Sequence, residues 1–158
     1  MKLPVIDNAR ARAIFLERHG LEGGQAGSGK GDDLGNVIQG LGFVQLDSVN
    51  TFARAHDLIL WSRRGQYRPR NMELLQARDR QLFEHWTHDA AVIPLAFYPH
   101  WQLRRTRDAA RLRSRWSKDR RDGFEAQFQN VLDHIRDHGS CSPSDVGKDE
   151  KRGSGGWW

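Results

Sequence analysis

The sequence predicts a mainly α-helical protein with small β-hairpins, an α+β fold. Apolar residues recur at helical spacing along much of the chain, and the segment LFEHWTHDAAVIP (82–94) has the pattern of two short strands joined by a turn. Six Trp and seven Phe residues supply large apolar surface from few positions. With 158 residues, the chain has room for one ordinary domain or two small ones.

The N-terminal elements are predicted from caps and glycines. Asp7 or Asn8 can cap a first helix, and Gly20 can end it. A glycine-rich loop over 23–33 follows, and Asp33 at its end can cap a second helix that Gly42 ends. We therefore expect two short helices separated by a flexible loop.

The next elements change from extended to helical. Residues 43–49 favour an extended segment, and residues 54–64 favour a helix whose inward face carries Leu58, Leu60 and Trp61. A turn at Pro69 then precedes a short helix from Met72, which leads into the hairpin. Helices followed by a hairpin are typical of a winged helix.

The C-terminal part predicts a further helix, because apolar residues from Phe124 to Ile135 recur at helical spacing until Gly139. Ser142 or Ser144 can cap another. The full prediction is a tandem winged helix-turn-helix protein with an incomplete second unit. Its parts are a first winged-helix domain with the catalytic motif over 1–100, a basic connecting helix over 101–122, and a truncated second unit over 123–158.

Positive charge is concentrated in one segment. The formal net charge is +5. In the stretch 102–121, many Arg and Lys residues are balanced by only two acidic residues, Asp108 and Asp119. DNA phosphates are a natural counter-charge for such a segment. The alternative is a solvated, Arg-rich helix that only joins two subdomains.

The sequence pattern argues against a membrane protein and a secreted, disulfide-linked protein. No stretch approaches the roughly 18 apolar residues of a membrane span, and the N-terminus has no apolar core of a signal peptide. The single cysteine, Cys141, cannot form an internal disulfide. We therefore expect a cytoplasmic protein, associated with the nucleoid if it binds DNA, and no membrane partner.

No cofactor or metal is expected. Gly24, Gly29 and Lys30 have the spacing of a phosphate-binding loop, but Gly31 stands where Ser or Thr should follow, so we expect no nucleotide cofactor. A zinc site is not expected either, because the candidate ligands His134, His138 and Cys141 have no fourth partner nearby.

The most informative residues are Gln45 and Asp47. If residues 44–48 are extended, these two side chains lie on one face, roughly 7 Å apart, while Val44 and Leu46 face the other way. A carboxylate can activate water or stabilise an oxocarbenium ion, and an amide can hold that water, so the pair suits hydrolysis at a sugar anomeric carbon. The alternative is that Asp47 caps a helix.

Three blocks resemble the YcaQ/AlkZ-type crosslink-repair DNA glycosylases: GFVQLDSVN with ARAH (42–50 and 53–56), LFEHWTHDAA with Pro94 (82–94), and KRGSGGWW (151–158). The resemblance implies tandem winged helices, no cofactor, and hydrolysis of the N-glycosidic bond of alkylated purines in double-stranded DNA, including interstrand crosslinks. It implies catalytic roles for Gln45 and Asp47, which match the family's motif.

For DNA contacts we expect six basic residues: Arg54, His56, His88, Arg104, Arg105 and Arg111. Members of the family are about twice this length, so we expect this chain to be an N-terminal fragment whose activity alone is in doubt and whose full-length form is monomeric. The alternative function is a non-catalytic winged-helix DNA-binding module or regulator, in which the basic residues suffice.

Overall fold

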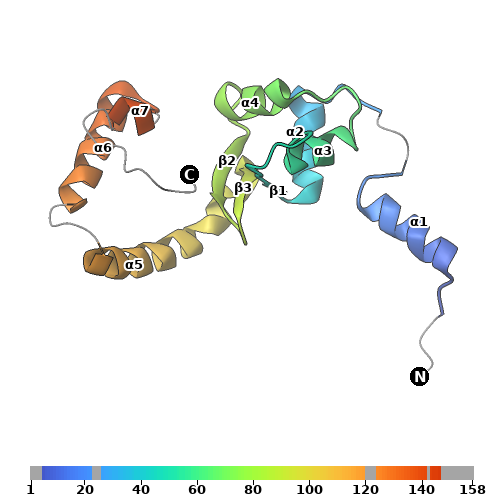
Figure 1. The fold of residues 1–158 in the computed structure, drawn as a ribbon, viewed down its shortest axis with the longest axis horizontal. Coiled ribbons are helices and arrows are strands. Elements are labelled where there is room, and N and C mark those ends of the chain that lie inside the picture. The colour runs from blue at the N-terminus through green and yellow to red at the C-terminus, as the bar shows by residue number, and fades with distance from the viewer. Residues whose placement is uncertain (1–4, 23–25, 120–123, 142, 147–158) are drawn as a thin grey trace. The chain divides into compact units, whose positions relative to one another are not determined.

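A computed structural model describes residues 5–22, 26–119, 124–141 and 143–146. The chain divides into two compact units, residues 1–104 and 105–158 (Figure 1). The first unit contains α1 (Asn8–Arg18), α2 (Gly31–Leu41), β1 (Val44–Gln45), α3 (Ala55–Trp61), α4 (Pro69–Ala77), β2 (Leu82–Trp86), β3 (Ala90–Pro94) and the 3-10 helix η1 (Leu95–Trp101). The prediction of a mainly helical α+β fold is confirmed.

The strands of the first unit form one three-stranded sheet in the order β1-β3-β2. Both pairings are antiparallel, with Val44 opposite Val92 in one and Phe83 opposite Ile93 in the other. The hairpin predicted over 82–94 is therefore confirmed. Because β3 lies between its neighbours, the short strand β1 is held against the hairpin, and the segment that follows β1 starts beside the hairpin turn.

The core of this unit lies where α2, α3 and α4 meet one face of the sheet. Leu34 and Ile38 of α2 are fully buried because they are four residues apart and share one helix face. Their neighbours in the cluster come from the other elements: Val44, Leu60, Tyr67, Met72, Leu75, Leu82 and Val92. Each large apolar side chain buried in this way stabilises the fold by about 1.5–3 kcal/mol.

The second unit contains most of α5 (Gln102–Asp119), α6 (Phe124–His138) and the single turn α7 (Pro143–Val146). Arg107, Arg113 and Arg115 of α5 are exposed, so the basic segment is helical and presents its charges to solvent. In the described part of the chain, none of the helices has the length and apolarity needed to cross a bilayer.

Several predicted helix ends are confirmed. The Asp7 carboxylate accepts the backbone N–H of Arg10 at 2.9 Å and caps α1. Gly20, Gly42 and Gly139 follow α1, α2 and α6 with positive φ angles of 65°, 85° and 85°, which glycine adopts without steric cost. Of the two serines predicted to cap the last helix, Ser144 lies within α7 and Ser142 lies outside the described residues.

The predicted cap at Asp33 is wrong. Helix α2 begins at Gly31, with Lys30 at the cap position, so Asp33 lies inside its first turn and the loop is shorter than predicted. The Asp33 carboxylate instead accepts the Gly29 N–H at 2.8 Å and pairs with the Arg64 guanidinium at 2.8 Å. Burial raises the pKa of the Asp33 carboxyl, but the contacts with Gly29 and Arg64 outweigh it and leave the pKa below its usual value.

Helix α3 also differs from its prediction. It is shorter than the predicted 54–64 segment, and only Leu60 of the three predicted inward residues is buried. Leu58 is 42% exposed and Trp61 is 48% exposed, because the inward face of this short helix is set by His56 and Leu60 at a spacing of four. Pro69 is the first residue of α4 rather than a preceding turn, since a proline at that position sacrifices no helical hydrogen bond.

Gly29 docks the loop before α2 onto the turn between α3 and α4, and its replacement tests that contact. A Cβ atom at Gly29 would lie 2.6 Å from the backbone nitrogen of Tyr67, at a φ of +63°. We expect Gly29→Ala to lower the free energy of unfolding by roughly 2–5 kcal/mol in urea titration. Gly42→Ala, at φ +85° with nothing within 4 Å, is the matched control and should lose only about 1–2 kcal/mol. Equal losses at the two glycines would contradict this packing.

Candidate active site

The segment after β1 carries both predicted catalytic residues. Val44 is buried and Leu46 packs against the core, whereas Gln45 and Asp47 are partly exposed, as expected for alternating side chains. Regular pairing ends at Gln45, but the Leu46 N–H still donates to the Ala90 carbonyl at 2.8 Å. The backbone is thus fixed against β3 up to the residue before Asp47.

The amide of Gln45 is held by two residues of the hairpin turn. Its Nε2 donates to the Asp89 carboxylate at 3.3 Å, and its Oε1 lies 3.0 Å from Nε2 of His88. Asp89 is itself anchored, because its Oδ1 accepts the Ala90 N–H at 2.8 Å. The two contacts fix which end of the amide carries the oxygen, so Gln45 presents a defined donor and acceptor.

Asp47 is held at its backbone and at one carboxylate oxygen. Its Oδ1 accepts the Val49 N–H at 2.8 Å, a local turn of the kind that aspartate favours. No helix begins there, so the alternative that Asp47 is a helix cap does not describe this residue. Among the described residues, the second oxygen, Oδ2, has no hydrogen-bond partner. This oxygen is therefore available to accept a proton, or a hydrogen bond from a water molecule.

His56 supports Asp47 from the core. Its ring is 3% exposed, and its Nδ1 accepts the Asp47 backbone N–H at 3.0 Å. An Nδ1 that accepts must be deprotonated, so the neutral ring carries its hydrogen on Nε2, which lies 3.9 Å from a carboxylate oxygen of Asp57. Burial lowers the pKa of His56, while the Asp57 carboxylate partly opposes that shift and Arg54 reinforces it.

The contacts continue from His56 to Tyr67. The Tyr67 hydroxyl donates to Oδ1 of Asp57 at 2.7 Å, and Tyr67 is 2% exposed. Burial, followed by the contact with Asp57, raises the pKa of Tyr67 far above its usual range, so the hydroxyl stays a donor. The backbone of Asp47 is therefore connected to the core through His56, Asp57 and Tyr67.

The other predicted DNA-binding residues lie in different places. His88 is exposed in the hairpin turn with its ring edge-on to Phe43, and Arg104 donates to the Thr87 carbonyl of the same turn at 2.8 Å. Arg54 is exposed before α3. Arg105 and Arg111 belong to α5 in the second unit, where Arg111 pairs with Asp108 at 3.3 Å. His56 is the exception, since its buried position suits support of Asp47 rather than contact with solvent.

Residues 38–158, more than half of the chain, match the family described as DNA glycosylase AlkZ-like. The chain belongs to this family. The resemblance given by the three sequence blocks is therefore confirmed, and Gln45 and Asp47 lie within the matched region. No solved structure matches the chain.

Three residues of this AlkZ-like site were not predicted from the sequence. Asp89 directly follows His88, and Asp57 directly follows His56. Because both histidines are candidate site residues, this adjacency is the only sign of the two aspartates in the sequence. Tyr67 had none, because it meets Asp57 only through the packing of the α3–α4 turn. Within the described ranges, no three His, Cys, Asp or Glu side chains lie close enough together to hold a metal ion.

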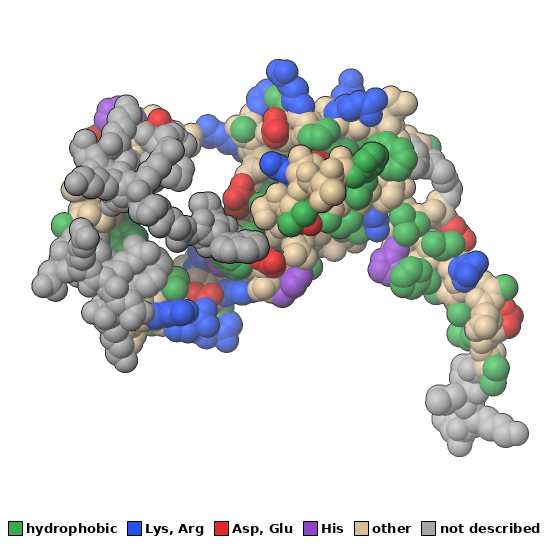
Figure 2. Space-filling view, viewed as in Figure 1, with side chains coloured by type: hydrophobic (Ala, Val, Ile, Leu, Met, Phe, Trp, Pro, Cys, Tyr) green, Lys and Arg blue, Asp and Glu red, His purple; other side chains and the backbone are tan. Residues whose placement is uncertain are grey.

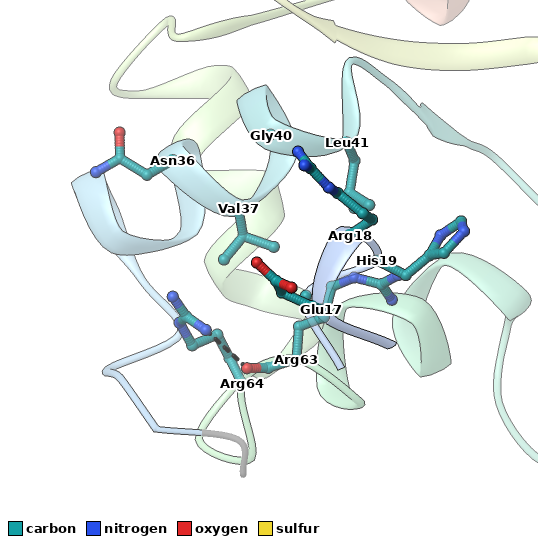
Figure 3. A pocket seen from close by; sticks show the side chains of 10 residues that line it. Glu17, Arg18, His19, Asn36, Val37, Gly40, Leu41, Arg63 and Arg64 are labelled. Atoms are coloured by element: carbon teal, nitrogen blue, oxygen red, sulfur yellow. Dashed lines mark hydrogen bonds between the residues drawn. The ribbon is translucent and has the colours of Figure 1, made fainter. Parts of the chain in front are cut away.

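A cavity of about 230 Å³ lies away from this site, between the end of α1, helix α2 and the turn that follows α3. Figure 3 shows Glu17, Arg18, Arg63 and Arg64 among the side chains that line it. Arg64 is paired with Asp33, and Arg63 donates to the Ile59 carbonyl at 2.8 Å. Glu17 shares the lining, and Arg63 and Arg64 each have a structural partner, so two of the three arginines that line the cavity are engaged within the fold.

The buried His56 predicts a dependence of stability on pH. Unfolded histidine titrates near pH 6.5, and folded His56 titrates lower, so below about pH 6.5 the unfolded state binds more protons. The free energy of unfolding should therefore fall as the pH drops from 7 towards 5, by up to about 1.4 kcal/mol per pH unit from this residue, and stay level above pH 7.

His56→Asn tests that prediction, because the Asn Oδ1 can still accept the Asp47 N–H but does not titrate. Urea titrations between pH 5 and 8 should show a weaker decline for this variant than for the unchanged protein. His100→Asn, at an exposed histidine of η1, controls for the loss of an imidazole. The same decline in His56→Asn and the unchanged protein would show that His56 does not supply it.

Proposed function

We propose that the protein hydrolyses the N-glycosidic bond of alkylated purines in double-stranded DNA, including those in interstrand crosslinks. Gln45 and Asp47 act on the attacking water. The observation that carries this proposal is the ordered pair itself: an amide fixed by His88 and Asp89, two residues from a carboxylate with an available oxygen, in a chain of the AlkZ-like DNA glycosylase family. As a DNA repair enzyme it would act as a monomer at the nucleoid in the cytoplasm.

The proposed chemistry needs no general acid. Water attacks C1′ of the sugar, the bond from C1′ to the purine N9 breaks, and the bonding electrons pass to the base. A purine alkylated at N7 is cationic, so it leaves as a neutral molecule. Asp47 accepts the proton of the water and stabilises positive charge at C1′, while Gln45 orients the water through its second amide hydrogen.

We also propose that the first unit is a winged helix. Its order of α2, β1, α3, α4 and the β2–β3 hairpin, with the sheet order β1-β3-β2, supports this assignment. By the same proposal residues 1–100 form the first domain, α5 is the core of the connecting segment over 101–122, and residues 123–158 begin a second unit of the same kind. Helix α4 would then face the DNA groove, flanked by the hairpin.

DNA contacts are assigned to the basic residues on the turn and on α5. Arg104 already contacts the hairpin turn through the Thr87 carbonyl, beside His88, which contacts Gln45. A phosphate near this turn would therefore lie close to the water that Gln45 holds. Arg54 of the first unit, and Arg105 and Arg111 of the second, are further candidates for phosphate contacts. The net charge of +5 favours a polyanionic partner.

Asp47→Asn tests the catalytic assignment with little structural disturbance, because the Asn Oδ1 can still accept the Val49 N–H. We expect release of N7-methylguanine from duplex DNA to fall at least about 100-fold, with DNA binding retained. Asp79→Asn, at a carboxylate paired with Arg78, is the control and should leave release unchanged. Unchanged release by Asp47→Asn would remove Asp47 from the mechanism. No release by the unchanged protein, with DNA binding intact, would favour a non-catalytic DNA-binding module.

The double variant Arg105→Glu with Arg111→Glu tests the role of α5. Each lost phosphate contact should lower the slope of log K against log salt by about 0.9, so DNA binding should weaken and depend less on salt. Fluorescence anisotropy across a salt series measures this. Arg136→Glu, at a paired arginine of α6, is the control. A slope unaltered by the double variant would remove these two residues from the interface.

A further inference from the structure

An apolar cavity of about 510 Å³ opens beside the segment that follows Asp47. Its lining comes from that segment, from α3 and from the α3–α4 turn, and includes Asn50, Phe52, Asp57, Leu58, Trp61 and Tyr67. Figure 2 shows hydrophobic side chains gathered over α3 in the first unit. The volume falls within the range of about 300–1,000 Å³ that is typical of small-molecule sites.

The aromatic rings of this cavity are unusually exposed for their size. Phe52 is 92% exposed and Trp61 is 48% exposed, and both residues line the cavity. Exposed apolar clusters of this kind commonly mark a binding site, because leaving them in water costs free energy that a ligand can recover. Neither ring has a role in the core.

The charge of the cavity selects the kind of ligand. Among the described residues that line it, Asp57 alone carries a charge, and its carboxylate is oriented by the Tyr67 hydroxyl at 2.7 Å. Aromatic faces attract cations through their quadrupole, and a carboxylate adds to that attraction. Together they suit a planar cation and disfavour an anion such as phosphate.

The cavity also lies close to the proposed chemistry. Asn50 is three residues beyond Asp47, so their Cα atoms are at most roughly 11 Å apart. His56 connects the two places directly, since it accepts the Asp47 N–H on one side and faces the Asp57 carboxylate on the other. A base held in the cavity would thus place its sugar near the Asp47 carboxylate.

We propose that this cavity receives the N7-alkylated purine of a single adduct after it is extruded from the duplex, since a crosslinked purine stays tied to the opposite strand. Phe52 and Trp61 stack against the flat cationic ring, and Asp57 offsets its positive charge. The released base is neutral, so it is held less tightly than the substrate. This inference rests on the proposed function and names the part of the site that recognises the base.

The test measures binding of N7-methylguanosine, which is cationic in mildly acidic buffer, and of neutral guanosine, by quenching of tryptophan fluorescence in the whole protein. We expect N7-methylguanosine to bind roughly 3- to 30-fold more tightly than guanosine. Phe52→Leu and Asp57→Asn should each weaken that binding by a similar factor. Phe15→Leu, at an exposed phenylalanine of α1 outside the cavity, should leave binding unchanged.

Both substitutions preserve local structure. Phe52 is almost fully exposed, and in Asp57→Asn the amide oxygen of the new side chain can still accept the Tyr67 hydroxyl. Equal binding of the two nucleosides, or N7-methylguanosine binding that Phe52→Leu does not weaken, would overturn the inference. So would concentration-dependent dimerisation that Phe52→Leu abolishes without any nucleoside binding, since the patch would then join two copies of the chain.

Base release from N7-methylguanine DNA separates this inference from the proposed function. Normal release by Phe52→Leu and Asp57→Asn would overturn the cavity as the base site and leave glycosylase activity standing. Absence of release by the unchanged protein would instead overturn the proposed function, whatever the nucleoside assay shows. If both proposals hold, Phe52→Leu should slow release mainly by raising KM, while Phe15→Leu should not.

Discussion

The hydrogen bond from the Asp47 backbone to buried His56 is the constraint on which the candidate site depends. Regular strand pairing ends two residues earlier, and without a further anchor the segment after β1 would be a mobile loop. His56 supplies that anchor from the core, and its neutral state is fixed because Nδ1 must accept a hydrogen bond. The position of the Asp47 carboxylate therefore follows from the packing of α3.

The second anchor acts on Gln45 and comes from the hairpin. The β2–β3 turn contributes Asp89 and His88, which hold the two ends of the amide. The sheet order makes this possible, because β3 lies between β2 and β1 and brings the turn to the end of β1. Two side chains separated by one residue in sequence are thus oriented by different elements, the hairpin for Gln45 and helix α3 for Asp47.

Local signals in the sequence predicted much of the fold. The hairpin over 82–94 and the helix ends at Gly20, Gly42 and Gly139 are confirmed, since alternation and positive φ are properties of short segments. Alternation also anticipated that Val44 is buried while Gln45 and Asp47 are partly exposed. The family motif identified Gln45 and Asp47 as candidates, but the contacts that orient them join residues about 44 and 9 positions apart.

What the sequence could not predict depends on packing between elements. Asp33 has the features of a helix cap, yet it is drawn into a pair with Arg64, which the sequence places far from it. Leu58 and Trp61 are large apolar residues, which predicts burial, but only one face of the short helix α3 meets the core. Both residues line the cavity proposed to hold the base, and under that proposal their exposure serves binding rather than burial.

The mechanism proposed for Gln45 and Asp47 requires that both side chains act on the same water. Single-turnover release of N7-methylguanine by Gln45→Ala, Asp47→Asn and the double variant tests this requirement. We expect the double variant to be no slower than the slower single variant, because either change already disables the shared water. Rate losses that multiply in the double variant would show instead that the two side chains have independent tasks.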